Sequence, residues 1–195
     1  MDGLILAGGK SSRMNGTHKG SLMYHEQSFV SLLIGEMKKE VEEVWLSYGR
    51  VVHEEYEGCK IVRDMDLDCG PIGGLCAGIE ACSDNEVMVA ACDMPFLKVE
   101  MFRYLYYNED NWEKDWDCIV PIVDGRKHPL AAIYRKSSLR ILKQQIKEKN
   151  YRIMDMLEKM RVIYVDVSDD PQYRNMLSNI NTPEEYKRRC LVAYS

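Results

Sequence analysis

Short apolar runs alternate with helical patterns along most of the chain. Five runs have the length and composition of buried strands: 3–7, 44–48, 59–62, 87–91 and 118–122. Between them, apolar residues recur at helical spacing at 29–37, 72–79 and 99–107. Such alternation predicts an α/β fold, in which a mainly parallel sheet carries helices on both faces. Ligands of such folds lie at the carboxyl ends of the strands, so functional residues are expected there.

The second half of the chain predicts a departure from this parallel order. Asp124-Gly125 is a turn pair between two apolar runs, so we expect an antiparallel hairpin that returns through 130–134. Two helical patterns and a strand follow, at 137–149, 152–160 and 161–167. Near the end, Thr182-Pro183 places an N-cap residue before a proline at the first helical position, which predicts a closing helix.

The composition is that of an ordinary globular protein, 46% hydrophobic and 29% charged, and residues 1–195 are expected to form one domain. The net charge of −5 and a pI near 5.5 argue against a general nucleic-acid binder. The apolar run at 4–7 is too short for a membrane span, and Asp2 stands where export would require a basic leader, so a cytoplasmic protein is expected. The seven cysteines form no C-x-x-C pair, which favours free thiols over a zinc site.

The first strand runs directly into the segment Leu6-Ala7-Gly8-Gly9-Lys10-Ser11-Ser12-Arg13-Met14. Glycines let backbone N–H groups turn toward an anion, because they tolerate positive φ and carry no side chain, so this segment has the chemistry of a phosphate cradle. It is not a Walker A loop, since Leu4 stands where that motif needs glycine, and no G-x-G-x-x-G register fits. By itself a Gly-Gly pair is weak evidence, and a plain structural turn is the simpler interpretation.

Further motifs follow the glycine segment in a fixed order. They are Lys19, Ile61-Val62-Arg63-Asp64, Gly70-Pro71-Ile72-Gly73-Gly74-Leu75, Cys92-Asp93-Met94-Pro95-Phe96-Leu97, His128-Pro129-Leu130 and Asn179-Ile180-Asn181-Thr182-Pro183-Glu184-Glu185. Together they resemble the signature of the molybdenum cofactor guanylyltransferases, over essentially the whole chain. The resemblance implies a three-layer α/β/α Rossmann-like nucleotidyltransferase fold, with a nucleotide-binding part at about 1–97 and an acceptor-binding part at about 98–190.

The resemblance also implies a site for GTP and Mg²⁺ in which Arg13, Lys19 and Asp93 serve catalysis. Arg13 and Lys19, with the N–H groups of 7–11, would hold the triphosphate; solvated surface cations are the alternative. Asp93 follows the apolar run at 87–91, where a carboxylate could ligate a dication that bridges phosphates, although an Asp that caps the next helix is also compatible. Binding contacts are implied at Leu6, Ala7, Gly8, Gly9, Lys19, Ser47, Asp64, Gly70, Pro71, Asp93, His128 and Asn181.

Four of these binding positions, Asp64, Ser47, Gly70 and Pro71, leave questions open. Asp64 could accept hydrogen bonds from guanine or ribose, or simply belong to the acidic turn at 64–68. Ser47 stands where the family usually has Asn, so a shorter hydroxyl replaces an amide. Gly70-Pro71 either binds an anion at a helix N-terminus or only connects a strand to a helix.

A basic group in the expected hairpin is a candidate for the acceptor. His128 begins the His-Pro stretch of the family and follows Arg126 and Lys127, with Arg152 further along the chain. These residues could receive the phosphate of an anionic pterin acceptor. A solvated charged turn is the alternative, above all for Arg126 and Lys127.

The reaction that the resemblance implies is transfer of GMP from GTP to molybdopterin-bound molybdenum, with release of pyrophosphate and formation of the guanine dinucleotide cofactor. An acceptor phosphate attacks the α-phosphorus, so the protein mainly positions groups and neutralises charge. The sister cytidylyltransferases usually have Leu-Ala-Ala-Gly at the glycine segment, so Gly9 favours GTP. A non-catalytic nucleotide-binding accessory protein is the alternative from another class; the presence of Arg13, Lys19 and Asp93 together argues against it. Other cofactor-assembly proteins and apo-molybdoenzymes are further expected partners.

Overall fold

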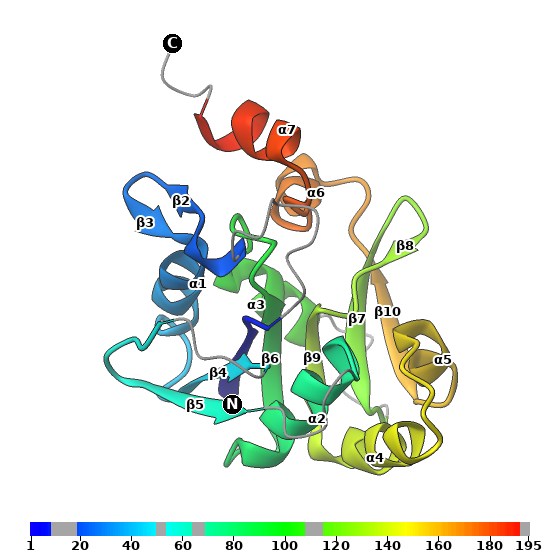
Figure 1. Cartoon of the computed structure of the whole chain (residues 1–195). Helices are drawn as coiled ribbons and strands as arrows, with labels where there is room; N and C mark the ends of the chain where they lie inside the picture. Colours follow the sequence, from blue (N-terminus) through cyan, green and yellow to red (C-terminus); the bar gives the residue numbers. More distant parts are fainter. Residues whose placement is uncertain (9–18, 50–53, 64–68, 108–114, 192–195) are drawn as a thin grey trace.

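A mixed sheet with helices on both faces organises the chain (Figure 1). The computed structural model describes residues 1–8, 19–49, 54–63, 69–107 and 115–191. The strands of the large sheet are β1 (Asp2–Leu6), β4 (Val44–Tyr48), β5 (Cys59–Arg63), β6 (Glu86–Ala91), β7 (Cys118–Val123), β8 (Arg126–Lys127), β9 (Ala131–Arg135) and β10 (Val162–Asp166). A separate two-stranded sheet pairs β2 (Met23–Tyr24) with β3 (Gln27–Ser28).

The helices alternate with these strands along the sequence. They are α1 (Phe29–Met37), α2 (Pro71–Ala81), α3 (Val99–Tyr106), α4 (Leu139–Lys147), α5 (Ile153–Glu158), α6 (Pro171–Met176) and α7 (Pro183–Tyr186). Short 3₁₀ turns lie at Lys19–Ser21 and Lys136–Ser138, and a π-helical turn at Lys187–Leu191 follows α7. In the part of the chain that the structure describes, no helix is long and apolar enough to cross a membrane.

The strand order is β10-β7-β9-β6-β1-β4-β5, and β8 pairs with β7. β1 is parallel to both of its neighbours, β4 and β6, and β4 is parallel to β5. β9 lies antiparallel between β6 and β7, because the chain turns back at Asp124 and Gly125, which have φ of 50° and 74°. The predicted α/β fold with a mainly parallel sheet and an antiparallel hairpin is therefore confirmed.

Burial on both faces of the sheet explains why its central strands are continuous apolar runs. Leu4 and Leu6 of β1 pack in the core beneath α2, α4 and α5, whereas Ile5 and Ala7 pack beneath α1 and α3. Helix α2 lies close to β1, since a Cβ on Gly78 would lie 2.4 Å from the Cδ atoms of Leu4. A larger residue there would push α2 away from the sheet.

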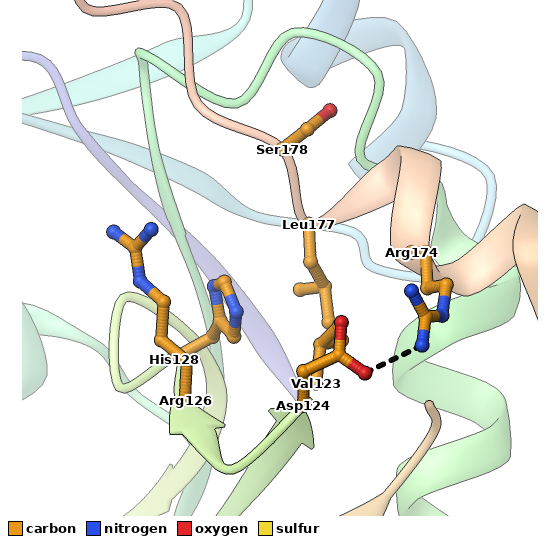
Figure 2. A pocket seen from close by; sticks show the side chains of 7 residues that line it. All are labelled: Val123, Asp124, Arg126, His128, Arg174, Leu177 and Ser178. Carbon is orange, nitrogen blue, oxygen red and sulfur yellow. Dashed lines mark hydrogen bonds and ion pairs between the residues drawn. The ribbon is translucent and has the colours of Figure 1, made fainter. Parts of the chain in front are cut away.

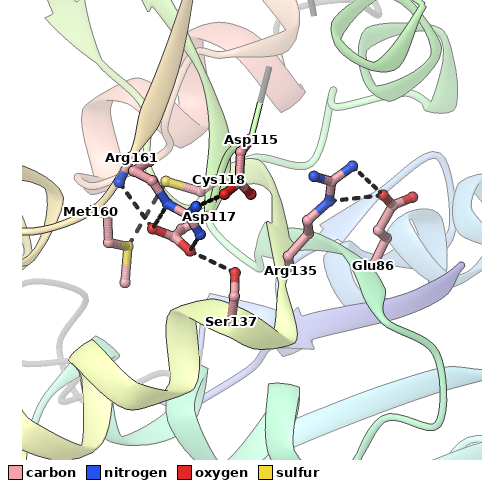
Figure 3. A network of polar contacts seen from close by, with 8 residues as sticks. All are labelled: Glu86, Asp115, Asp117, Cys118, Arg135, Ser137, Met160 and Arg161. Carbon is pink, nitrogen blue, oxygen red and sulfur yellow. Dashed lines mark hydrogen bonds and ion pairs between the residues drawn. The ribbon is translucent and has the colours of Figure 1, made fainter. Parts of the chain in front are cut away.

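The amino ends of β7 and β10 are fastened by a buried carboxylate (Figure 3). Asp117, which is 4% exposed, accepts hydrogen bonds from the backbone N–H and the guanidinium of Arg161 and from Ser137 Oγ. Close by, Arg135 pairs with Glu86 and stacks on Trp116 at 3.5 Å. These groups satisfy one another at the end of the sheet opposite the carboxyl ends of its parallel strands, so their role is structural.

Two local features differ from the sequence prediction. The β2–β3 hairpin is not predicted, because its turn places His25 and Glu26 at φ of 47° and 64°, a conformation that these residue types rarely signal. Helix α6 is also missed, although Asp170 before Pro171 is the same cap signal as Thr182 before Pro183, and the Asp170 side chain does accept from Gln172 N–H at 2.7 Å. All seven cysteines are free thiols, as predicted, and six of them are buried.

Candidate active site

The carboxyl ends of β1 and β6 form the switch point of the sheet, since the chain runs from β1 to β4 and β5 on one side and then crosses back to β6 on the other side of β1. Cys92 N–H donates to Leu6 O at 3.1 Å, and Ala91 N–H donates to Leu130 O at 2.8 Å. These bonds extend the sheet past the end of β6. As a result, Asp93 emerges beside the end of β1, as predicted for a ligand group of a doubly wound fold.

Three polar side chains from distant parts of the sequence meet at this point, and we call them the Lys19–Asp93–Asn181 cluster. Lys19 Nζ donates to Asn181 Oδ1 at 2.5 Å and lies 3.4 Å from Asp93 Oδ2. The lysine and aspartate side chains are 22% and 20% exposed, so solvent screens this ion pair only partly. The structure therefore brings together three of the predicted site residues.

Backbone hydrogen bonds and a capping box hold Asn181 in place. Ile180 N–H donates to Asp93 O at 2.7 Å, which ties this segment to the end of β6. Glu185 Oε2 accepts from the N–H groups of Asn181 and Thr182 at 2.7 and 3.0 Å, and Thr182 Oγ1 accepts from Glu185 N–H at 3.1 Å. The N-cap of α7 thus fixes the backbone that presents the Asn181 amide to Lys19.

The Asp93 carboxylate has one oxygen engaged and one without a partner. Oδ2 faces Lys19, whereas Oδ1 is buried and forms no hydrogen bond with any residue that the structure describes. An uncompensated buried carboxylate oxygen is unfavourable, so a cationic or hydrogen-bonding ligand would stabilise it. Magnesium prefers such oxygens and takes one or two carboxylates with phosphates and water, so the donor set fits it. Among the residues that the structure describes, no group of three His, Cys, Asp or Glu side chains forms a metal site.

The start of the glycine segment is hydrogen-bonded to the neighbouring strand β4. Ala7 N–H and Gly8 N–H both donate to Ser47 O, at 2.9 and 3.0 Å, so the sheet already engages these two donors. Gly8 is required for close packing, since a Cβ there would lie 2.8 Å from Gly49 N. Phosphate contacts at Ala7 and Gly8 stay predictions. Gly9 and Arg13 lie outside the described residues, as does Asp64.

The remaining predicted nucleotide contacts lie around the same end of the sheet. Leu6 is buried, and its backbone oxygen accepts from Cys92 N–H. Ser47 is 2% exposed and its hydroxyl lies against α2, where a Cβ on Gly74 would come within 2.8 Å of Oγ. Gly70, at φ 60°, and Pro71 are exposed at the N-terminus of α2. Their contacts with a nucleotide stay predictions.

His128 lies apart from the cluster, in a pocket of about 280 Å³ beside the turn that follows β7 (Figure 2). We call it the β7 pocket. Its lining residues are Val123, Asp124, Arg126, His128, Arg174, Leu177 and Ser178. His128 is 8% exposed, and burial, assisted by the charge of Arg126, lowers the pKa of its imidazole to about 4. The ring is therefore neutral near pH 7.

Sequence reasoning missed part of this arrangement. It did not identify Arg174 or the capping role of Glu185. The signal for Glu185 was present, because Thr182 and a Glu three positions later form the capping-box pattern. Nothing local to Arg174 places it near the hairpin, because that contact depends on where the segment after β10 returns.

Comparisons with known proteins agree with this geometry. The profile of a family described as "MobA-like NTP transferase domain" matches residues 3–163. A Clostridium perfringens protein named "Probable molybdenum cofactor guanylyltransferase" is 31% identical over 94% of this chain and 92% of its own length. A Halalkalibacterium halodurans protein of the same name is 29% identical over 94% of both chains. The crystal structure of molybdopterin-guanine dinucleotide biosynthesis protein A from Archaeoglobus fulgidus superposes with a TM-score of 0.80 at 24% identity, covering 99% of this chain and 98% of that one.

Proposed function

Because the chain belongs to the MobA-like NTP transferase family, we propose that it is a molybdenum cofactor guanylyltransferase. It would transfer GMP from GTP to the molybdopterin form of the cofactor and release pyrophosphate. The names of its relatives support this substrate pair. The observation that carries the proposal is the meeting of Lys19, Asp93 and Asn181 at the switch point of the sheet.

The proposed reaction needs positive charge around the phosphates. An oxygen of the acceptor phosphate attacks the α-phosphorus of GTP, and the bond from that phosphorus to the α–β bridging oxygen breaks as pyrophosphate leaves. Lys19 donates to Asn181 and faces Asp93, so its ammonium group is oriented and keeps donor capacity for a phosphate oxygen. Arg13 is proposed as a second cation for the triphosphate.

We propose that Asp93 holds Mg²⁺ through its unpartnered Oδ1. When bound, the ion would supply positive charge that neutralises the charge developing on the leaving pyrophosphate. The ion pair with Lys19 keeps Oδ2 turned toward the lysine, so a single carboxylate serves both cations. Asn181 accepts a hydrogen bond from Lys19 and helps to fix the position of the ammonium group.

A thermal-shift titration tests the proposed nucleotide. The protein is melted with GTP, CTP, UTP or ATP in the presence of Mg²⁺, and GTP is expected to raise the melting temperature most, because a ligand that binds only the folded state stabilises it by mass action. Selection of GTP is proposed to rest on Gly9 and Asp64. A larger shift with CTP would contradict this substrate assignment and favour the cytidylyltransferase.

Asp93→Ala tests the mechanism. Pyrophosphate release in the presence of GTP, Mg²⁺ and molybdopterin is expected to fall to background, while the circular dichroism spectrum stays that of the wild type. Glu158→Ala removes an exposed carboxylate on α5 and serves as the matched control, with unchanged turnover expected. Unchanged pyrophosphate release by Asp93→Ala would refute the proposed role of this carboxylate. GTP binding by a wild type that transfers no GMP would instead identify a nucleotide-binding accessory protein.

A further inference from the structure

The β7 pocket contains a buried polar group that the fold itself does not use. The imidazole of His128 lines the pocket, is 8% exposed, and forms no hydrogen bond with any other described residue. Its backbone is held in place, since His128 N–H donates to Pro121 O at 3.0 Å and Ala131 N–H donates to His128 O at 3.1 Å. The ring nitrogens therefore have no partner among the described residues, and in the pocket lining they are placed to form a hydrogen bond with a ligand.

The pocket also carries excess positive charge. Arg174 pairs with Asp124 at 2.5 Å and donates from Nε to the backbone oxygen of Ser168, so its guanidinium is fixed at the rim. Arg126 is exposed and has no ion-pair partner among the described residues. Figure 2 shows Arg126 beside His128, with the Asp124–Arg174 pair on the other side. With His128 neutral, two arginines and one aspartate leave one positive charge, which suits an anionic ligand.

One short segment connects the pocket to the Lys19–Asp93–Asn181 cluster. Leu177 and Ser178 line the pocket, and Asn181 contacts Lys19. Three residues of extended chain span at most about 10 Å, which limits the distance between the Cα atoms of Ser178 and Asn181. A ligand of moderate size can therefore reach from one site to the other.

We propose that the β7 pocket binds a second anionic group of the acceptor, distinct from the phosphate that attacks GTP, with Arg126 and Arg174 as charged ligands and His128 as a hydrogen-bond partner. This inference rests on the proposed function, which places the attacking phosphate at the cluster. The metal-bearing end of a pterin acceptor is such a group. The pocket would fix the orientation of the acceptor and contribute to its selection.

A charge series at Arg126 tests the pocket, because this side chain is exposed and its replacement is expected to leave the fold intact. The Michaelis constant for molybdopterin, prepared with and without molybdate, is measured at saturating GTP for Arg126→Lys, Arg126→Gln and Arg126→Glu. Loss of one charge-assisted hydrogen bond is expected to raise this constant about tenfold for the Gln variant, less for Lys and more for Glu. The dissociation constant for GTP and the maximal rate should stay within about twofold of wild type. Arg140→Gln, an exposed arginine on α4, should change neither constant.

Each outcome of this series separates the inference from the proposed function. If the wild type transfers GMP and all Arg126 variants have the wild-type Michaelis constant for molybdopterin, the proposed role of the β7 pocket is refuted and the proposed function stands. An equal rise in the constants for acceptor and GTP would also refute that role, since it would indicate a general disturbance of the site. A wild type that transfers no GMP would refute the function. In that case equilibrium binding of molybdopterin tests the proposed role of the pocket. Weaker binding to Arg126→Glu than to the wild type would support this role, and equal binding would refute it.

Discussion

Acid should destabilise the folded protein through His128 in a pH range where ordinary surface histidines have little effect. Burial and the charge of Arg126 lower the pKa of this imidazole from 6.5 to about 4. The unfolded chain therefore takes up a proton near pH 6.5, while the folded chain takes it up only near pH 4. Between these values the unfolded state binds more protons, so the free energy of unfolding falls as the pH falls and levels off below about pH 4.

The size of this effect follows from the two pKa values. Each pKa unit corresponds to about 1.4 kcal/mol, so the full difference amounts to about 3 kcal/mol. Between about pH 7 and about pH 4.5, where most of the transition lies, the loss should be about 2 kcal/mol. Such a loss is a large fraction of the stability of an ordinary domain.

Urea unfolding of the wild type and of His128→Gln, at about pH 7 and about pH 4.5, isolates the contribution of His128 to this loss of stability. The substitution changes packing in the pocket, but that change is the same at each pH, and carboxylates elsewhere titrate equally in both proteins. We therefore expect the wild type to lose about 2 kcal/mol more than the variant on acidification. Equal losses would show that the folded state protonates His128 normally, and the account of a buried neutral imidazole would be wrong.

Two further substitutions test the packing and the cap. Gly78→Ala, whose Cβ would lie 2.4 Å from Leu4, should lower the free energy of unfolding by about 1–3 kcal/mol. Gly35→Ala on α1, where a Cβ would have no atom within 4 Å, should raise the free energy of unfolding by about 0.5–1 kcal/mol. Urea unfolding of both variants measures these changes, and equal effects would contradict the close packing of α2 on β1. Thr182→Ala should cost about 1 kcal/mol and slow GMP transfer, because the capping box fixes Asn181, while Thr182→Ser keeps the capping oxygen and should retain both properties.

Sequence reasoning predicts most of this fold because burial determines the pattern. β1, β4 and β6 lie between helices on both faces, so nearly every residue in them is apolar and the runs are easy to identify. The β2–β3 hairpin shows where the approach fails. Its strands have two residues each, too short for a recognisable alternation, and its turn places His25 and Glu26 in a left-handed conformation.

The site shows the same division between local and tertiary information. Lys19, Asp93 and Asn181 were each predicted from motifs, but their contact joins residues 74 and 162 positions apart and requires the complete strand order. The N–H groups of Ala7 and Gly8 show a contact that the local sequence does not indicate. A glycine after a strand suggested free donors, whereas the parallel neighbour β4 supplies Ser47 O as their acceptor. Local sequence does not show which donors a neighbouring strand will engage.

The unpartnered oxygen of Asp93 explains why Lys19 and Asn181 belong to the same site. Without Lys19 both oxygens of this carboxylate would lack a partner in a setting that is only about one-fifth exposed, which would be unfavourable for the folded protein. Lys19 compensates Oδ2, and Asn181 draws the ammonium group to one side, so that Oδ1 stays available. The cluster is therefore organised before any ligand binds. The proposed metal–nucleotide complex would then need to supply only the partner that Oδ1 lacks, and little rearrangement would oppose its binding.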